Sequence, residues 1–530
     1  MAEAVEAKTR SAEDIFKEFK EHSISEFFRK NSQMLGFSGR VRSMTTLVHE
    51  YVTNSLDAAE EASILPEISV EVREISEGKY YIRVSDNGPG IPRKHVGKAL
   101  GVILAGTKFA RYMQQRGQQG IGAAGCTMYA LVTTGKPVHV VCGTSKDSYE
   151  CDLSLDIKSN RPVVTNMKDM QTDANGMAVS GEFGDLKYEM SDHGVYEYLR
   201  RTALANPHAS IRLIDPEGKE SLFPRSVNEM PKRPKLIKPH PLGIGTSDLL
   251  DFTRATESRR LSSFLTDTFA RFTPNQLEQL KQVPGVKEMD WSRDPRTITW
   301  QDAERLVNAF KQIKWIAPDL DSLSTIGEQQ IEIAIKNIIN PQFVTVIERK
   351  PVVFRGGIPF VVEAGIAYGG NAGRKTEQGV GGNVLRYANK VPLLFDTAAC
   401  AITEATKGVE WKRYSIQNFD EEPVSVFVNV SSVYIPYSGV GKQAIAQEEE
   451  IVYEIKLAVM DAARRMQRYL SGMRSAKIAE TRYNAIMRYV SQLSGDLGDI
   501  TGEKRDAIEA ALKDLIEKRY KKIFEEDSAQ

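Results

Sequence analysis

Three polar residues at helical spacing are the first candidates for chemistry in this sequence: Glu50, Asn54 and Asp57. They stand at positions i, i+4 and i+7, so on a helix their side chains share one face. A second, apolar set lines the opposite face of the same helix: Met44, Val48, Val52 and Leu56. A carboxylate and an amide that point into a pocket can polarise a water molecule and hold a divalent cation such as Mg²⁺. A solvated helix face has the same pattern, so this stretch needs support from the rest of the chain.

A second candidate is the turn SDNGPGIP at residues 85–92, which follows the alternating, strand-like KYYIRVSD. Gly88 and Gly90 stand where a backbone must bend sharply or let a ligand approach closely. Asp86, at the end of the strand, can accept a hydrogen bond. Taken alone, the segment predicts no more than a turn.

A third candidate is RGQQGIGAAG at residues 116–125, whose glycines precede an apolar run. The free backbone N–H groups of such a segment can cradle phosphates at the N-terminus of a helix. The glycine order is neither that of a P-loop nor GxGxxG, so neither of those two nucleotide-binding mechanisms is supported. Just upstream, Thr107 and Lys108 could bring a hydroxyl group and a cation to phosphate oxygens.

In this order and within one domain's length, the three segments resemble the ATP site of the GHKL superfamily, which includes gyrase-type ATPases, Hsp90, histidine kinases and MutL. The resemblance implies that Glu50 activates the hydrolytic water, that Asn54 holds Mg²⁺ and that Asp86 accepts from the adenine amino group. It also implies further nucleotide-binding residues in or near these segments: Asp57, Gly90, Thr107, Lys108, Gly117, Gln118, Gln119, Gly120, Ile121, Gly122, Ala123 and Ala124. The expected cofactors are therefore ATP and Mg²⁺.

Three stretches narrow this resemblance: RGQQGIG, LRYANKVPLLFD at 385–396 and IPYSGVGKQAIA at 435–446. All three look like the B-subunit family of archaeal DNA topoisomerase VI, and the similarity spans nearly the whole chain. In the third stretch, Gly439 and Gly441 let the backbone bend, and Lys442 can project as a point charge. A surface lysine in a glycine loop usually has no role in a site. The resemblance nevertheless implies that Lys442 reaches across to the γ-phosphate and takes part in catalysis.

The composition is that of an ordinary globular protein of 530 residues, of which 41% are apolar. Such a length predicts about two to four domains. The 70 basic and 70 acidic side chains cancel, so no overall field draws the chain to nucleic acid, and any DNA contact must be local. The four cysteines have no CxxC spacing, which argues against a zinc site or a disulfide framework. No apolar run approaches the ~18 residues that span a bilayer, and we expect a cytoplasmic protein.

The chain is expected to be an α/β multidomain protein, and the resemblance implies the order of its parts. These are a GHKL α/β sandwich ATPase, a small helical helix-two-turns-helix domain, an α/β transducer domain and C-terminal helices. The expected boundaries, in chain order, are an N-terminal arm at 1–22, the ATPase domain at 23–228, the helix-two-turns-helix domain at 229–320, the transducer at 321–474 and a partner-binding helical region at 475–530.

Local signals support parts of this division. The basic, proline-rich MPKRPKLIKPH at 230–240 indicates a linker or a DNA-facing rim. In the helical region after it, Thr273 predicts an N-cap, Pro274 a first helical position and Gly285 a stop. A small helical spacer is an equally open interpretation of this region. A helix is expected from about residue 443 to 470, and an apolar stripe at 508–515 predicts a docking face for a partner.

The resemblance implies the ATP-hydrolysing subunit of a type IIB DNA topoisomerase. ATP would drive dimerisation of B subunits and so gate passage of one DNA duplex through a double-strand break made by an A subunit, within an A2B2 heterotetramer that relaxes and decatenates DNA. Because no DxD-type acidic cluster follows a strand, we expect that this chain does not cut DNA itself. The alternative is a GHKL clamp or chaperone, like MutL or Hsp90, without a DNA-cleaving partner. The run at 385–446, and the expected lack of a C-terminal domain like theirs, favours the topoisomerase.

Overall fold

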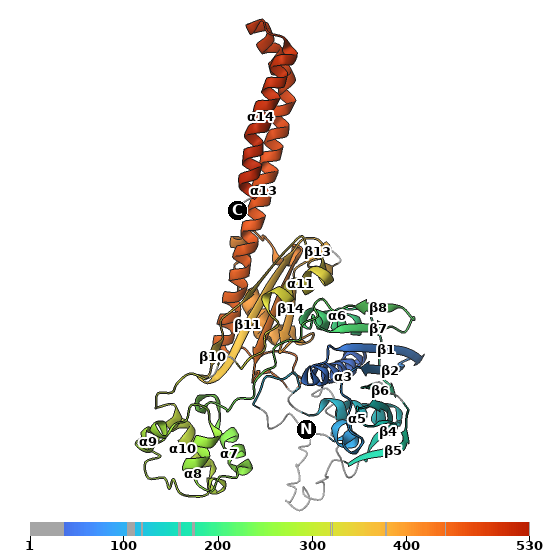
Figure 1. Ribbon diagram of the computed structural model, residues 1–530, viewed down its shortest axis with the longest axis vertical. Helices are drawn as coiled ribbons and strands as arrows, with labels where there is room; N and C mark the ends of the chain where they lie inside the picture. The colour runs from blue at the N-terminus through green and yellow to red at the C-terminus, as the bar shows by residue number, and fades with distance from the viewer. Residues whose placement is uncertain are drawn as a thin grey trace, which may run out of the picture.

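The computed structural model describes residues 36–102, 112–117, 120–156, 161–171, 175–318, 320, 322–376, 379–439 and 441–528. The arm expected at 1–22 lies outside these residues, as do four predicted nucleotide-binding residues: Thr107, Lys108, Gln118 and Gln119. The described chain forms two large sheets, a group of short helices and a long helical hairpin (Figure 1). The α/β multidomain class predicted from the sequence is confirmed.

The first sheet has eight strands in the order β5-β4-β3-β6-β2-β1-β7-β8. Its strands are β1 (Glu67–Ser76), β2 (Lys79–Asp86), β3 (Val138–Gly143), β4 (Ser148–Asp156), β5 (Arg161–Asp169), β6 (Gly176–Phe183), β7 (Ser210–Ile214) and β8 (Glu220–Phe223). β1 pairs with β7 in parallel, and the other neighbouring pairs are antiparallel. Apolar residues alternate along β1 and β2, so Ile68, Val70, Tyr80 and Ile82 point into the core.

Helices pack against this sheet and carry the polar candidates. They are α3 (Arg40–Ala62), α4 (Val96–Gly101), α5 (Gly122–Thr134) and α6 (Val195–Ala205). Figure 1 shows α3 and α5 together on one side of the sheet. The predicted apolar face of α3 is buried, with Met44, Val48, Val52 and Leu56 at most 2% exposed. Because that face joins the core shared with the sheet, the opposite face of α3 is left for polar contacts.

Short helices follow residues 227–240, which contain no helix or strand. They are α7 (Thr246–Ala255), α8 (Leu261–Thr268), α9 (Pro274–Lys281) and α10 (Trp300–Phe310), and their shared core is rich in aromatic rings. α9 begins as predicted, with Thr273 at its N-cap and Pro274 in its first turn. It ends before the predicted stop at Gly285, because Pro284 disfavours helical backbone in the residue before it.

The second sheet follows the order β10-β11-β16-β14-β15, and β9 also pairs with β11. Its strands are β9 (Phe343–Glu348), β10 (Val352–Phe354), β11 (Ile358–Tyr368), β14 (Asn383–Ala388), β15 (Val391–Pro392) and β16 (Val424–Ser432), and a separate hairpin joins β12 (Arg374–Thr376) to β13 (Gly379–Gly381). β14 and β16 run in parallel, whereas the other pairs are antiparallel. Helices α11 (Glu328–Ile339) and α12 (Ala401–Lys407) accompany this sheet.

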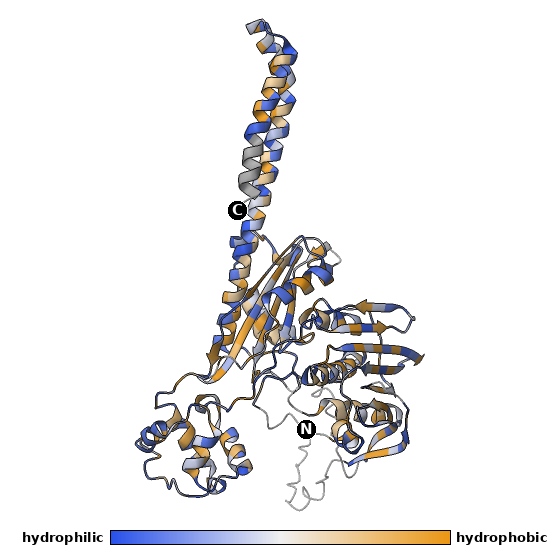
Figure 2. Ribbon diagram, viewed as in Figure 1, coloured by the Kyte–Doolittle hydropathy of each residue, from blue (hydrophilic) through white to orange (hydrophobic). Residues whose placement is uncertain are grey.

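The central strands of the second sheet are buried on both faces. Phe427 of β16 lies in a core with Ile331 and Ile335 of α11, whereas its neighbours Val426 and Val428 lie in a second core with residues of α13. Successive side chains of a strand point to opposite faces, so one strand serves both cores. Figure 2 shows the resulting concentration of hydrophobic residues in this sheet.

Helix α13 (Glu449–Thr501) is 53 residues long, and α14 (Arg505–Ser528) folds back along it. Figure 1 shows this hairpin projecting from the second sheet. The helix expected at about 443–470 is therefore too short, and the boundary expected between 474 and 475 falls inside α13. None of the helices that the structure describes combines the length and the apolarity needed to cross a bilayer.

Candidate active site

Glu50 and Asn54 lie near the middle of α3, on the polar face that the sequence predicted. Both side chains are half-buried. Within the part of the chain that the structure describes, neither forms a hydrogen bond or an ion pair. A carboxylate and an amide that are fixed by their helix, yet have no partner of their own, are available to a water molecule and a metal ion.

The carboxylate of Glu50 lies over the first residue of α5. A Cβ atom at Gly122 would overlap Glu50 Oε2, so only glycine permits this close approach. The first N–H groups of a helix have no partner within the helix, and the helix dipole adds partial positive charge there. α5 therefore offers a site for an anion directly beside the candidate base, formed by the predicted residues Ile121, Gly122, Ala123 and Ala124.

Asp86 ends β2, and its carboxylate is held from three directions. Ser55 Oγ donates to Asp86 Oδ2 at 2.6 Å, and the backbone N–H groups of Gly88 and Met177 donate to Oδ1 at 2.9 and 3.3 Å. Ser55 comes from α3, immediately after Asn54, so one hydrogen bond joins α3 to the glycine turn. The sequence pattern did not single out Ser55, and its place next to Asn54 is the only signal that could have done so.

The same turn needs a glycine at position 90. Its φ is +69°, and a Cβ atom there would clash with the carbonyl oxygen of Gly143. The turn therefore packs directly against the end of β3. Whether Gly90 contacts a nucleotide stays a prediction.

Lys442 comes from the second-sheet part of the chain and yet lies beside α3. Its loop passes Gly36 and Arg42, which are the closest neighbours of a Cβ atom built at Gly441. Burial lowers the pKa of His49, Glu50 opposes that shift, and Lys442 lowers the pKa further. The contacts of its loop with Gly36 and Arg42 place Lys442 beside the start of α3, the helix that carries Glu50. The structure thus brings Lys442 and Glu50 to the same region, although they are far apart in sequence.

A second contact joins the same two parts of the chain. Arg42 of α3 forms an ion pair with Asp396 at 3.3 Å, and its guanidinium lies 4.4 Å from the centroid of the Phe395 ring. Asp396 adopts a left-handed backbone with φ of 53°. The LLFD end of the sequence stretch at 385–396 is therefore a contact surface for α3.

Asp57 differs from the two residues with which the sequence pattern grouped it. Its side chain is buried, and its Oδ1 accepts from Arg116 Nη1 at 2.9 Å. Arg116 also binds Glu60, one turn further along α3. Asp57 therefore belongs to a buried ionic network, and a contact between Asp57 and nucleotide stays a prediction. Gly117 and Gly120 are described, but no contact with a ligand tests them or the four predicted residues outside the described ranges.

Comparison with known proteins matches two stretches of the chain to family models. Residues 39–159 match the family model described as histidine kinase-, DNA gyrase B-, and HSP90-like ATPase. Residues 318–482 match the model for the transducer of the topoisomerase VI B subunit. A solved structure described as the N-terminal domain of a DNA repair protein aligns with 81% of this chain and 96% of that chain, at 13% identity and a TM-score of 0.40, a likeness too weak to identify the fold.

Two full-length relatives are much more similar. The B subunit of type 2 DNA topoisomerase 6 from Methanothermobacter thermautotrophicus is 43% identical over 486 residues, which cover 91% of this chain and 92% of the relative. The protein of the same name from Pyrococcus horikoshii is 41% identical over 552 residues, covering 96% and 97% of the two chains. The family expected from the sequence motifs is confirmed: this chain belongs to the B-subunit family of type 2 DNA topoisomerase 6.

Proposed function

We propose that this chain is the ATP-binding and ATP-hydrolysing subunit of a type IIB DNA topoisomerase. The observation that carries the proposal is the position of Glu50, whose carboxylate lies against the N-terminus of α5 at Gly122. A phosphate held by the N–H groups of α5 would place its terminal group within reach of a water molecule polarised by Glu50. The match of residues 39–159 to an ATPase family supports ATP as the nucleotide.

Asn54 is the proposed Mg²⁺ ligand, because its amide oxygen lies one helical turn from Glu50 and is not used by another described residue. When bound, Mg²⁺ would supply charge neutralisation to the phosphates. Asp86 is the proposed acceptor for the adenine amino group. Its carboxylate is already oriented by Ser55 and Gly88, so little ordering is needed on binding.

Lys442 is the proposed link between nucleotide and transducer. Its loop lies beside Gly36 and Arg42 at the start of α3, which supports a reach towards the γ-phosphate from the transducer side. A group that contacts only the triphosphate form would make the arrangement of the two domains depend on hydrolysis. We propose that this dependence drives ATP-dependent dimerisation of two B subunits.

The relatives are named as B subunits, so the proposed assembly includes an A subunit that cuts DNA, in a cytoplasmic A2B2 heterotetramer. Within it, ATP-driven closure of the B dimer would gate passage of one duplex through the break. The alternative, a clamp or chaperone without a cutting partner, lacks support from the match of 318–482 to the transducer of topoisomerase VI.

Relaxation of supercoiled plasmid tests the proposal. The chain together with an A subunit is expected to relax plasmid only when ATP and Mg²⁺ are present, and the chain alone is expected to leave it unchanged. A non-hydrolysable ATP analogue should convert the isolated chain from monomer to dimer in sedimentation. Relaxation by the pure chain alone, or by the mixture without ATP, would refute the proposal.

A further inference from the structure

The segment immediately before the glycine motif is fastened to the transducer. The side-chain amide of Gln114 bonds the backbone of Ser324 in both directions: Nε2 donates to the Ser324 carbonyl at 2.8 Å, and Oε1 accepts from its N–H at 2.7 Å. The next residue continues the attachment, because the carbonyl of Gln115 accepts from Asn389 Nδ2 at 3.0 Å. All four residues are buried, so water does not compete for these bonds.

The transducer side of this attachment is itself stiff. Asn389 and Lys390 form the turn between β14 and β15, with φ angles of 48° and 68°. Two successive positive φ angles are typical of a tight two-residue hairpin turn, which leaves little freedom between its strands. Lys390 Nζ also donates to Ser324 Oγ at 2.9 Å, so the turn and the residue bound by Gln114 are held together.

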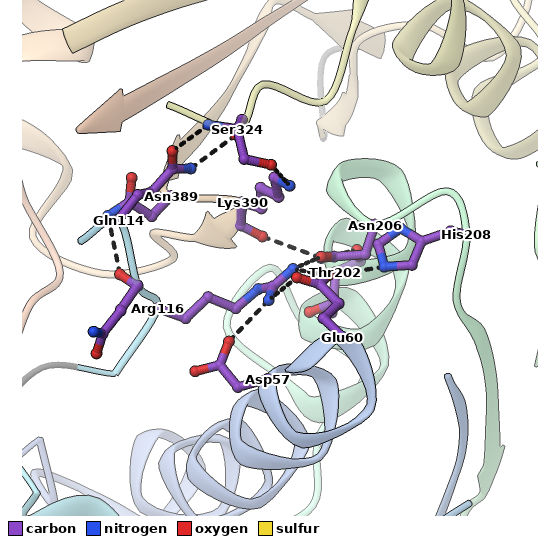
Figure 3. A network of polar contacts seen from close by, with 11 residues as sticks. Asp57, Glu60, Gln114, Arg116, Thr202, Asn206, His208, Ser324, Asn389 and Lys390 are labelled. Atoms are coloured by element: carbon purple, nitrogen blue, oxygen red, sulfur yellow. Dashed lines mark hydrogen bonds and ion pairs between the residues drawn. The ribbon is translucent and has the colours of Figure 1, made fainter. Parts of the chain in front are cut away.

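One residue further on, the same segment is fastened to the ATPase domain. Arg116 donates to Asp57 at 2.9 Å, to Glu60 at 2.5 Å and to Asn206 at 2.6 Å. Asn206 Nδ2 in turn donates to the carbonyl of Lys390 at 3.1 Å. Figure 3 shows these side chains converging from α3, from the end of α6 and from the transducer turn.

One attachment lies two residues before the glycine motif, at Gln114, and the other lies at the first residue of the motif, Arg116. Gln114 is hydrogen-bonded to the transducer, and Arg116 is ion-paired to α3. Gly117 is the next residue of the chain. Helix α3 carries Glu50 and Asn54, so any shift of the transducer relative to α3 must act on the residues that lead into the motif. Contiguous networks of packed and hydrogen-bonded groups are the physical means by which movement passes between sites.

We propose that Gln114 and Arg116 are positioning residues that couple movement of the transducer to the glycine motif, and hence couple DNA transport to ATP hydrolysis. The proposal rests on the proposed function, because it assigns these residues a role within that ATPase cycle. Neither residue touches the reacting atoms. Gln114 links the motif to the transducer, and Arg116 binds the motif to α3, the helix that carries the candidate base.

The test uses the full chain assembled with an A subunit and the variant Gln114→Ala. ATP consumption and plasmid relaxation are measured in the same reaction. We expect ATP affinity and DNA-independent hydrolysis to stay near those of the unaltered protein. The ATP consumed per relaxation event should rise about fivefold or more, the scale of a coupling free energy between two sites. Gln114→Glu should act in the same direction, because it places an oxygen opposite the Ser324 carbonyl.

The matched control is Asp396→Asn, which removes the ion pair with Arg42 between the same two domains without touching residues 112–116. Asparagine tolerates the left-handed backbone at this position, so the turn should persist. The control should leave the ATP consumed per relaxation event within about twofold of the unaltered protein, the size of a half-exposed ion pair.

Two results would overturn the proposal. One is an equal loss of hydrolysis and relaxation in Gln114→Ala, as expected for a residue that only supports the fold. The other is an equal rise in ATP consumption per event in Asp396→Asn. If Gln114→Ala does not fold, the ATP consumed per relaxation event is measured for Gln114→Glu instead, and the same two results would overturn the proposal. Failure of the unaltered assembly to relax DNA with ATP would instead refute the proposed function.

Discussion

Helix α3 carries two polar regions that contain similar residues but differ in whether those residues have partners within the described chain. In its middle, Glu50 and Asn54 are half-buried and form no hydrogen bond or ion pair with any other described residue. In its last turns, Asp57 and Glu60 are bound by the guanidinium of Arg116. The chemistry of a carboxylate on this helix is thus decided by whether the fold supplies its partner. A carboxylate with an internal cation supports the structure, whereas one without remains available to a substrate.

A carboxylate outside α3, that of Glu363, sharpens this comparison. Burial alone would raise the pKa of Glu60, but Arg116, Lys390 and a hydrogen bond from His208 hold it well below its ordinary value. Glu363 of β11 is fully buried, and its hydrogen-bond donors among the described residues are neutral, coming from Ile326, Gly327 and Asn429. Burial raises the pKa of Glu363 to about 7. Direct contact with a cation therefore explains why the pKa of Glu60 is lowered whereas that of Glu363 is raised.

The largest effect on stability is expected for Glu60→Gln. The change leaves the buried guanidinium of Arg116 with one carboxylate fewer, and breaking a buried ion pair costs about 3 kcal/mol or more. Urea unfolding at neutral pH measures this loss. Because the pKa of Glu60 is lowered in the folded state, its contribution is complete above about pH 4.5 and is lost as the pH falls below that value.

The matched control is Glu61→Gln, which alters the next residue of α3 at an exposed position. Its effect on the free energy of unfolding should stay below about 1 kcal/mol. An equal loss in the two variants would show that the buried network contributes no more than a surface charge.

A smaller effect is expected in the pH dependence of Glu363→Gln. A carboxyl group whose pKa is near 7 in the folded state and near 4.5 in the unfolded state binds more protons when folded, so stability falls as the pH rises between these values. The total change is at most about 3 kcal/mol. Thermal or urea unfolding from pH 5 to 8 should show this slope in the unaltered chain and a flatter one in the variant. An unchanged slope in the variant would show that other groups cause the pH dependence of stability.

The features of the molecule that could be predicted from the sequence are those with local signals. The two faces of α3 follow from its apolar spacing, and the alternation of β1 and β2 follows from their side chains. Residues 116–125 suggested a phosphate-binding helix start, and α5 does begin at Gly122. Each of these signals is contained within one element or one turn.

The parts that the sequence could not predict depend on distant partners. Asp57 shares helical spacing with Glu50, but its partner Arg116 lies 59 positions along the chain. The bond between Gln114 and Ser324 spans 210 positions and has no motif. The length of α13 was underestimated for the same reason: beyond residue 470 the helix pairs with α14, and packing between two helices has no signal within α13 itself.

The smallest of the expected effects concerns base recognition by Asp86. Asp86→Asn keeps the shape of the side chain but replaces one acceptor oxygen by an N–H donor, so ATP affinity should fall by about 1–3 kcal/mol and preference over GTP should relax. Competition titrations with ATP and GTP measure both quantities. Ser55→Ala, which removes the 2.6 Å hydrogen bond to Asp86, should shift affinity in the same direction by less. Unchanged affinity and base preference in Asp86→Asn would make Asp86 a turn residue only.

The central claim is that Glu50, which has no partner among the described residues, is the general base for ATP hydrolysis, and Glu50→Gln tests it most directly. Glutamine keeps the size of the side chain beside Gly122 but cannot accept a proton from water. We expect ATP affinity and unfolding free energy close to those of the unaltered chain, with single-turnover hydrolysis at least ~100-fold slower, the scale of general base catalysis. An unchanged hydrolysis rate would contradict the claim. So would a loss of stability as large as that of Glu60→Gln, because it would place Glu50 among the structural carboxylates of α3.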